Sequence, residues 1–276
     1  MTVEAHALTK AYRTVVAVQD LSFTAGAGEV IGLLGPNGAG KTTAIRVLTT
    51  ILAPTAGSFA VAGIPHTRPA EIRRRVGVLP ESAGYPEQQT GMEFLRYHAR
   101  LYGHSRASAQ STSAALLRDV GLGERRSSPI ATYSRGMRQR LGIARALVND
   151  PAVVFLDEPT LGLDPAGQEQ VLRVIERISR EHAATVIVST HLLAEVEEVC
   201  SRVLILNRGR LIADGTVADI ARRAAAPRHA LLRVSADARE QALQALTEAG
   251  IPLVASELEG ARLSDAFLTM TGEGAG

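Results

Sequence analysis

The residues best suited to chemistry are a glycine-rich run with one lysine, Gly35-Pro36-Asn37-Gly38-Ala39-Gly40-Lys41-Thr42. Their spacing matches the phosphate-binding loop pattern G-x-x-x-x-G-K-[ST] at every fixed position. Glycines let the backbone wrap closely, so that successive N–H groups point at phosphate oxygens. Lys41 would reach the β- and γ-phosphates of a nucleotide, and the Thr42 hydroxyl would ligate Mg²⁺. We include Thr43, the next residue, among the candidate nucleotide-binding residues; the alternative is an ordinary glycine-rich turn.

Three further polar residues follow apolar runs of the kind that form buried strands. Asp157 and Glu158 come at the end of Val153–Leu156. His191 directly follows Thr185–Thr190. Parallel sheets bind ligands at the carboxyl ends of their strands, so we expect these residues beside the glycine-rich loop. Asp157 would hold Mg²⁺, Glu158 would orient or deprotonate an attacking water, and His191 would donate a hydrogen bond to the γ-phosphate. The alternatives are an ordinary acidic strand end and a histidine at a helix start.

A second candidate anion-binding segment is Ser134–Arg140, which precedes a helical pattern running to Asn149. Ser134 is a candidate N-cap, and its hydroxyl, the nearby N–H groups and the helix dipole could all face an anion. Capping alone would also explain the serine. The segment lies more than 90 residues beyond Thr42, so it need not reach the glycine-rich loop of its own chain.

The elements that position these residues alternate between strand and helix. Val30–Leu34 is an apolar run before the loop and Ala44–Leu48 has helical character after it, which is the context that a phosphate-binding loop requires. The continuous apolar runs Val153–Leu156 and Thr185–Val188 suit strands buried on both faces of a parallel sheet. Gln168–Ser179, between them, predicts a crossover helix.

The flanking segments differ in character. Alternating patterns predict a β-rich N-terminal layer and one more strand, at Val3–Leu8, Val15–Phe23, Ser58–Ile64 and Val76–Leu79. Between about residues 86 and 150 strand patterns give way to helical periodicity, in Met92–Tyr102, Ser111–Val120 and Gly136–Val148. This part is predicted to be a helical subdomain inserted between parallel-sheet elements. Val203–Leu206 and Arg210–Ala213 flank a glycine-containing turn and predict a hairpin.

A linker-like stretch, Ala224–Pro227, separates residues 1–223 from a small appendage at residues 228–276. The appendage has a strand, helix, strand, helix pattern, in Ala230–Val234, Arg239–Ala249, Ile251–Ala255 and Leu263–Met270. We therefore predict an α/β fold. It has a P-loop core with a β-rich N-terminal layer, a helical insert and a small α+β C-terminal domain.

Composition bounds the possible partners. With 276 residues, 46% of them hydrophobic, the chain can bury a substantial core. A formal net charge of +2 makes no case for a nucleic-acid partner, and none is expected. One cysteine, Cys200, excludes an internal disulfide and a cysteine-based metal site. The N-terminus is too polar for a signal peptide, and no apolar run approaches the about 18 residues of a membrane span. We expect a soluble, cytosolic chain whose membrane role would need a partner.

Together, these motifs resemble the ATP-binding-cassette (ABC) ATPase family over about residues 1–220. The resemblance rests on the glycine-rich loop, Ser134–Arg140, Val153–Glu158 with the following Pro159–Pro165, and His191. A serine–glycine signature just upstream of the second carboxylate motif distinguishes this family from other P-loop proteins. The resemblance implies an ATPase in which two domains pair head to tail. Mg²⁺ and ATP would then lie between the P-loop of one and the signature of the other.

The resemblance also implies roles for single residues. Ser134 and Gly136 would contact the γ-phosphate across the interface, and Asp164 would lie in the loop that crosses between the two sites. His191 would be the switch histidine. Tyr12 would stack on adenine; the alternative is a strand-edge tyrosine that packs on the sheet.

Two departures from the family pattern stand out. The signature usually reads Ser-Gly-Gly-Gln, whereas here Arg135 and Met137 replace the first glycine and the glutamine. Arg135 would either add a charge near the phosphates or point to solvent. The family also usually has a glutamine after the strand Val76–Leu79, touching Mg²⁺ and the membrane partner. Glu81 stands there in this chain and is carried as a candidate metal ligand, with the membrane-contact surface placed around Glu81–Thr90.

Both departures are similar to the pattern in ATPase subunits of bacterial ABC-2 type exporters, as is the ending Leu263–Leu268. That resemblance implies a peripheral protein at the cytoplasmic face of the cell membrane. Its partners would be transmembrane permease subunits and a second ATPase subunit, identical or homologous. An importer ATPase subunit is one alternative, although its signature would more often keep Gly-Gly-Gln. A soluble, non-transport ABC ATPase is another, although such proteins carry two cassettes or a long coiled coil.

Overall fold

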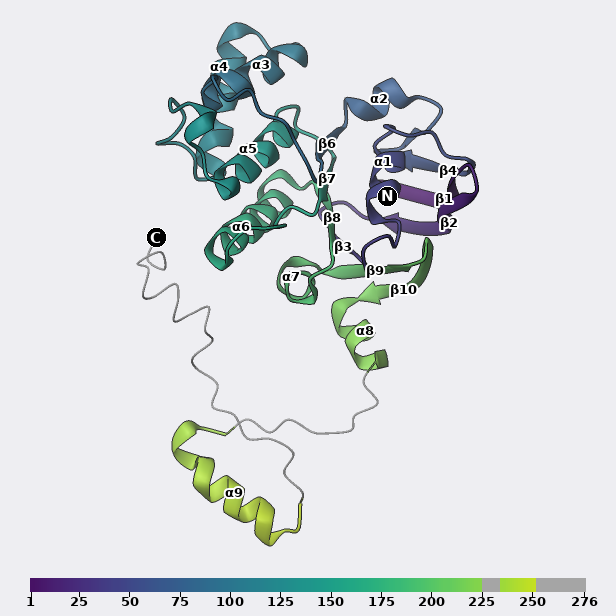
Figure 1. Cartoon of the computed structure of the whole chain (residues 1–276), viewed down its shortest axis with the longest axis vertical. Helices are drawn as coiled ribbons and strands as arrows, with labels where there is room; N and C mark the ends of the chain where they lie inside the picture. Colours follow the sequence, from purple (N-terminus) through teal and green to yellow (C-terminus); the bar gives the residue numbers. More distant parts are fainter. Residues whose placement is uncertain (225–233, 252–276) are drawn as a thin grey trace. The chain divides into compact units, whose positions relative to one another are not determined.

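The computed structural model describes residues 1–224 and 234–251 (Figure 1). Contacts divide the chain into two units, Met1–Ile220 and Ala221–Gly276. The first unit contains both sheets and every candidate site residue. No helix among the described residues combines the length and the apolar character needed to cross a membrane.

A six-stranded sheet, in the order β10-β9-β3-β8-β7-β6, forms the centre of the first unit. Its strands are β3 (Val30–Leu34), β6 (Val76–Leu79), β7 (Val153–Asp157), β8 (Thr185–Thr190), β9 (Arg202–Asn207) and β10 (Arg210–Thr216). All neighbours pair in parallel except β9 and β10, which form the predicted hairpin. Every residue of β3, β7 and β8 is buried, because helices or the second sheet cover both faces. For β7 and β8 this confirms the prediction from their continuous apolar runs.

The predicted N-terminal layer is a four-stranded antiparallel sheet in the order β2-β1-β4-β5. Its strands are β1 (Val3–Tyr12), β2 (Val15–Ala25), β4 (Ala56–Val61) and β5 (Ile64–Pro65). The predicted strand Ser58–Ile64 is wrong in its length, because Ala62 and Gly63 both have positive φ and turn the chain into a hairpin. Helix α1 (Lys41–Leu48) packs with both sheets: Ile45 and Leu48 share a buried cluster with Phe59 of β4 and Phe155 of β7.

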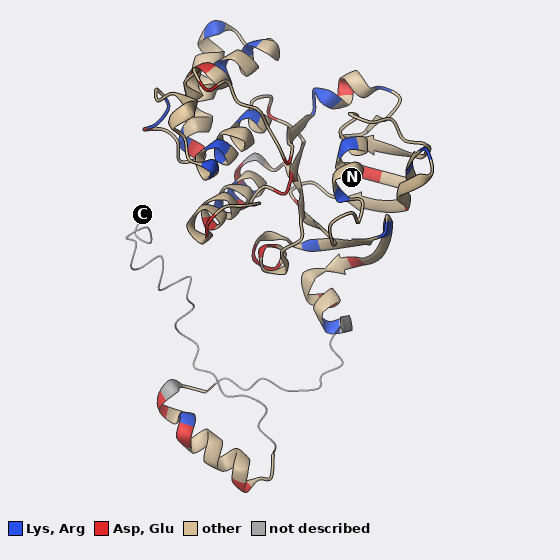
Figure 2. Cartoon of the chain, in the orientation of Figure 1, with Lys and Arg blue, Asp and Glu red and all other residues tan. Residues whose placement is uncertain are grey.

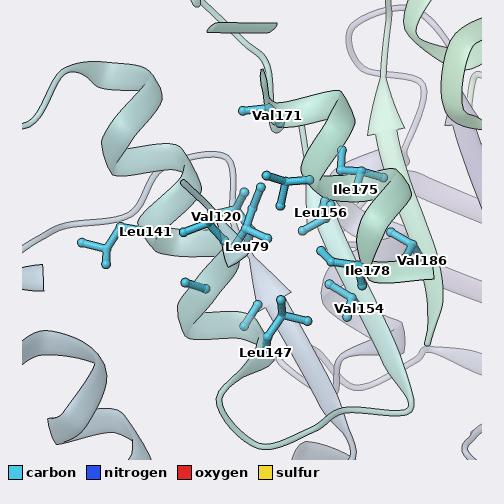
Figure 3. Packing of buried hydrophobic residues seen from close by; sticks show 14 of the residues in the cluster. Leu79, Val120, Leu141, Leu147, Val154, Leu156, Val171, Ile175, Ile178 and Val186 are labelled. Atoms are coloured by element: carbon cyan, nitrogen blue, oxygen red, sulfur yellow. The ribbon is translucent and has the colours of Figure 1, made fainter. Parts of the chain in front are cut away.

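Helices cover the other face of the parallel sheet (Figure 1). They include α5 (Arg135–Leu147) and α6 (Pro165–His182), the latter extending the predicted crossover helix at both ends. Figure 3 shows Val154, Leu156 and Val186 of the sheet packed with Ile175 and Ile178 of α6. Because alternate strand residues point to opposite faces, Val154 and Leu156 face α5 and α6, whereas Phe155 faces α1.

The helical insert contains α3 (Gly91–Leu101), α4 (Arg106–Asp119), a 3-10 turn (Ile130–Thr132) and α5. The three predicted helices are confirmed, but α4 begins at Arg106 rather than near Ser111. Its first turns are polar, so hydrophobic periodicity does not reveal them. The Ser105 hydroxyl instead marks the start, because it accepts a hydrogen bond from the Ser108 N–H.

Four short helices and a 3-10 turn (Ala236–Ala238) complete the described structure. Three were not predicted, namely α2 (Pro69–Arg73), α7 (Leu193–Val199) and α8 (Val217–Ala224). In the second unit, α9 (Arg239–Glu248) confirms the predicted helix there. The other predicted elements of the appendage lie outside the described residues, except Val234 and Ile251, which belong to neither helix nor strand.

A close approach at Gly77 fixes α5 against β6. A side-chain carbon on Gly77 would collide with the carbonyl oxygen of Ala146 in α5. We therefore expect Gly77→Ala to lower the free energy of unfolding by about 1–3 kcal/mol, the usual cost of overpacking a core. Thermal or urea unfolding of the full chain measures this. Gly84→Ala is the matched control, since nothing lies within 4 Å of its added carbon. Equal stability of the two variants would contradict the tight contact.

Candidate functional site

A pocket of about 540 Å³ opens at the carboxyl edge of the parallel sheet. Four segments predicted from separate motifs meet there. The described lining comprises Ala17, Asn37, Gly38, Ala39, Gly40, Lys41, Thr42, Thr43, Glu81, Glu158, Leu161 and His191. The structure thus brings together the glycine-rich loop and the predicted residues that follow β6, β7 and β8.

The loop between β3 and α1 has the geometry of an anion cradle. Gly40 has φ +103°, and an added Cβ there would collide with the carbonyl oxygen of Ala17, so only glycine fits. Helix α1 begins at the next residue, and no side chain among the described residues caps it. Its first N–H groups and the positive end of its dipole are therefore available to a phosphate.

The Lys41 ammonium lies inside the pocket between two oxygen acceptors. Its Nζ donates a hydrogen bond to the carbonyl oxygen of Gly35 at 2.7 Å. It also lies 3.3 Å from Oε1 of Glu158, and both side chains of this ion pair are more than nine-tenths buried. A buried charge needs such a partner, so the pair holds the lysine at the loop.

Both carboxylate oxygens of Glu158 contact a predicted site residue. Oε1 faces Lys41, and Oε2 lies 2.8 Å from Nδ1 of His191. Glu158 itself has φ +49°, a left-handed conformation that is uncommon for a residue other than glycine. Its N–H is held by the carbonyl oxygen of Ser189 at 3.1 Å and by the Ser189 hydroxyl at 3.0 Å. Backbone strain of this kind concentrates at functional sites.

Asp157 is buried and accepts two hydroxyl hydrogen bonds on one oxygen. Thr42 Oγ1 donates to its Oδ1 at 3.1 Å, and Ser189 Oγ donates to the same atom at 2.5 Å. The hydroxyl and the carboxylate are hard oxygen ligands of the kind that Mg²⁺ prefers, so these two residues fit a magnesium site. Glu81 is exposed and lines the same pocket, and its part in binding metal stays a prediction.

The signature residues lie elsewhere. Among the described residues, neither Ser134, Gly136 nor Asp164 lines the pocket. Ser134 caps α5 by accepting from the Met137 N–H at 3.2 Å, and Asp164 caps α6 by accepting from the Gly167 N–H at 3.1 Å.

The two capped helix ends are neighbours. A Cβ on Gly136 would lie 3.9 Å from the Cα of Gly167 and from a methyl group of Leu163. Helix α5 also carries four arginines and no acidic residue (Figure 2). The binding of an anion at this surface, which lies apart from the pocket, stays a prediction.

Arg135 turns back over its own chain. An added Cβ on Gly162 would lie 2.8 Å from Cζ and from Nη1 of Arg135, and 3.0 Å from Nη2. Three nearly equal distances mean that the flat face of the guanidinium covers Gly162. Arg135 remains exposed, and both sequence alternatives stay open. In this position the arginine links the signature to the loop before α6.

Tyr12 ends β1, and 42% of its surface is exposed. The Lys10 Nζ lies 5.4 Å from the centre of its ring. Ala17, from the neighbouring strand β2, lines the pocket. The stacking of Tyr12 on adenine stays a prediction.

Sequence reasoning missed Ser189, which contacts both Asp157 and Glu158. It lies in the strand Thr185–Thr190, directly after the apolar run, and is fully buried. One signal could have identified it. A hydroxyl near the end of a buried strand, two residues before His191 and therefore on the same face of the strand, needs a hydrogen-bond partner, which the neighbouring site residues could supply.

A sequence model of the ABC transporter family matches residues 18–161, just over half of the chain. The daunorubicin/doxorubicin resistance ATP-binding protein DrrA of Streptomyces peucetius is 41% identical over 219 residues, which cover 79% of this chain and 66% of that protein. The linearmycin resistance ATP-binding protein LnrL of Bacillus subtilis is 34% identical over 221 residues, or 80% of this chain and 71% of that protein. An uncharacterized ABC transporter ATP-binding protein of Synechocystis is 39% identical over 79% of this chain and 64% of its own length. This chain thus spans about two thirds of the length of these relatives.

Solved structures agree on the fold. An ATP-binding subunit of an ABC transporter matches with a TM-score of 0.70 at 30% identity, over 98% of this chain and 100% of that chain. A dimeric ATP-binding cassette bound to ADP and Pi matches with a TM-score of 0.71 at 23% identity, over 78% and 98% of the two chains. The second likeness concerns the fold alone. Both confirm the predicted α/β P-loop fold.

The family match, the sequence relatives and the fold agree with what the glycine-rich loop and the residues at the strand ends indicate. The chain belongs to the ABC transporter family, among its ATP-binding proteins.

Proposed function

We propose that this protein is the ATP-hydrolysing subunit of a membrane transporter, an ABC-2 type exporter, and that ATP closes two such subunits on each other. One observation carries the proposal. The pocket brings together the glycine-rich loop and the residues that directly follow β7 and β8, whereas Ser134 and Gly136 of the same chain do not line it. The pocket therefore resembles one half of a site that a second subunit completes.

ATP would bind with its phosphates at the start of α1. The loop N–H groups and the helix dipole favour the negative charge, and Lys41 lies within the pocket to meet the β- and γ-phosphates. Mg²⁺ would be held by Thr42 and Asp157, and when bound it offsets phosphate charge. Binding at this half of the site needs no residue from Ser134–Gly136.

Glu158 is the residue best placed to act as the base. In hydrolysis the oxygen of a water molecule bonds to the γ-phosphorus, the bond to the bridging oxygen of ADP breaks, and the proton of the water passes to a base. The Glu158 carboxylate faces the pocket and is held between Lys41 and His191. His191 would keep the carboxylate in place and contact the γ-phosphate, as expected for a switch histidine.

Ser134 and Gly136 would close the site of a partner subunit. Ser134 is exposed at the start of α5, with Asp164 at the neighbouring start of α6. The two helix starts are neighbours, so one partner surface could engage both. The partner is a second copy or a homologue.

The transport role is supported by the relatives. Two of them are named as drug or antibiotic resistance ATP-binding proteins. The Ser-Arg-Gly-Met sequence of the signature and Glu81 also resemble the pattern in exporter ATPase subunits. We propose a transmembrane permease as partner, with this chain peripheral at the cytoplasmic face of the membrane. Purification from native membranes tests this: a partner with several apolar spans should co-purify. Recovery with ribosomes and without a membrane protein would contradict it.

Glu158→Gln should remove the base while keeping its shape. The amide still fits between Lys41 and His191 but cannot accept the proton, so we expect turnover to fall by roughly 10²-fold or more. ATP binding should persist, and the closed dimer should accumulate. Phosphate release, ATP titration and sedimentation measure the three quantities.

Glu169→Gln is the control for this change, since Glu169 pairs with Arg173 on the surface of α6. It should behave like the parent protein. Unchanged turnover in Glu158→Gln would remove Glu158 from the role of base.

Ser134→Ala should lower hydrolysis without lowering the affinity of the monomer for ATP, because the serine acts on the site of the partner. The change also removes an N-cap, which by itself costs about 1 kcal/mol of stability. Ser105→Ala controls for that loss, since Ser105 caps α4 in the same helical insert. Rates are measured over a range of protein concentrations, and ATP binding at concentrations where the chain is monomeric. Loss of monomer binding in Ser134→Ala, or an equal loss of activity in both variants, would contradict the assignment across subunits.

A further inference from the structure

The Ser189 hydroxyl links the two carboxylate residues of the site. We propose that Ser189 is a positioning residue for ATP hydrolysis, which sets the direction of Glu158 and of Asp157 together. This inference rests on the proposed function and concerns the same pocket. Neither the glycine-rich loop nor the signature includes Ser189.

The register of the parallel sheet places Ser189 there. Asp157 at the end of β7 pairs with Ser189 in β8. The hydroxyl donates to Oδ1 of Asp157 at 2.5 Å and accepts from the Glu158 N–H at 3.0 Å. A serine hydroxyl has one hydrogen and two lone pairs, so both bonds can exist at once. Since Ser189 is fully buried, water does not compete for them.

The bond to the Glu158 N–H acts on a strained turn. With φ at +49°, the backbone at Glu158 turns away from the direction of β7, and the Glu158 side chain contacts Lys41 and His191. An extended backbone would continue the strand and turn the carboxylate away. Without the hydroxyl, the N–H would keep only the carbonyl oxygen of Ser189 as acceptor. The turn would then have one restraint instead of two.

The bond to Asp157 acts on the residue expected to hold Mg²⁺. Its Oδ1 also accepts from Thr42, so two hydroxyls from different elements fix the carboxylate. One buried group thereby ties the direction of the metal-binding oxygens to the direction of the base. A misplacement of about 1 Å in such an arrangement can cost about 10²-fold in rate.

The test compares Ser189→Ala, Ser189→Thr and Ser189→Val in the full chain. Threonine keeps the hydroxyl, and valine has the same shape without it, so the difference between them isolates the hydroxyl even if the added methyl group disturbs packing. Ser113→Ala is the control. Ser113 is also fully buried, in α4, and its hydroxyl has no hydrogen-bond partner among the described residues.

We expect Ser189→Ala and Ser189→Val to lower kcat by about 10-fold or more, the lower range for a displaced catalytic group. The affinity for ATP, measured in EDTA, should stay within about 3-fold of the parent. Ser189→Thr should regain most of the rate relative to Ser189→Val. Hydrogen exchange measured on peptides spanning Glu158 should speed up in Ser189→Ala and stay unchanged in Ser113→Ala, because the amide loses one acceptor. This last readout needs neither nucleotide nor turnover.

Parental kcat in Ser189→Ala, with parental exchange at Glu158, would overturn the inference. A joint fall in stability, ATP affinity and kcat, with equal rates in Ser189→Thr and Ser189→Val, would also overturn it, because that pattern marks a purely structural role. If the parent protein hydrolyses no ATP, the proposed function fails. The exchange measurement then still decides whether Ser189 holds the Glu158 turn.

Discussion

Parallel pairing of strands from distant parts of the chain is the constraint on which the site depends. Leu34 of β3 pairs with Thr190 of β8, Asp157 of β7 with Ser189 of β8, and Leu79 of β6 with Leu156 of β7. This register makes four strands end at one edge. The loop before α1, Glu81, Glu158 and His191 follow those ends directly, so they meet in one pocket. Burial on both faces fixes the register, because a slip by one residue would exchange the side chains that face α1 with those that face α5 and α6.

The packing of α5 on the sheet places the signature apart from the pocket. Helix α5 packs against β6 so closely that a side chain at Gly77 would meet the backbone of α5. Its N-terminus lies beside the start of α6, where Gly136 approaches Gly167. Ser134 and Asp164 therefore cap two neighbouring helix starts. A second subunit can meet this pair as one surface, which suits a site divided between two chains.

Much of this arrangement could be predicted from the sequence, because it follows from local patterns. Continuous apolar runs predicted β3, β7 and β8, and the glycine spacing predicted a phosphate loop before α1. Polar residues after two of those runs predicted which side chains meet, since parallel strands share a carboxyl edge. Helical periodicity found the insert but not the start of α4, where the first turns are polar.

What could not be predicted depends on tertiary contacts. Ser189 follows the apolar run of β8, so the sequence suggests a buried hydroxyl there. The register with β7 is needed to show that this hydroxyl meets Asp157 and Glu158. The direction of Arg135 depends on Gly162, which approaches it from another loop. The left-handed turn at Glu158 opposes the preference of a glutamate, and it persists because hydrogen bonds from a neighbouring strand hold it. At this residue tertiary hydrogen bonds override the local preference of the chain. The turn that results directs into the pocket the carboxylate that the proposed chemistry requires.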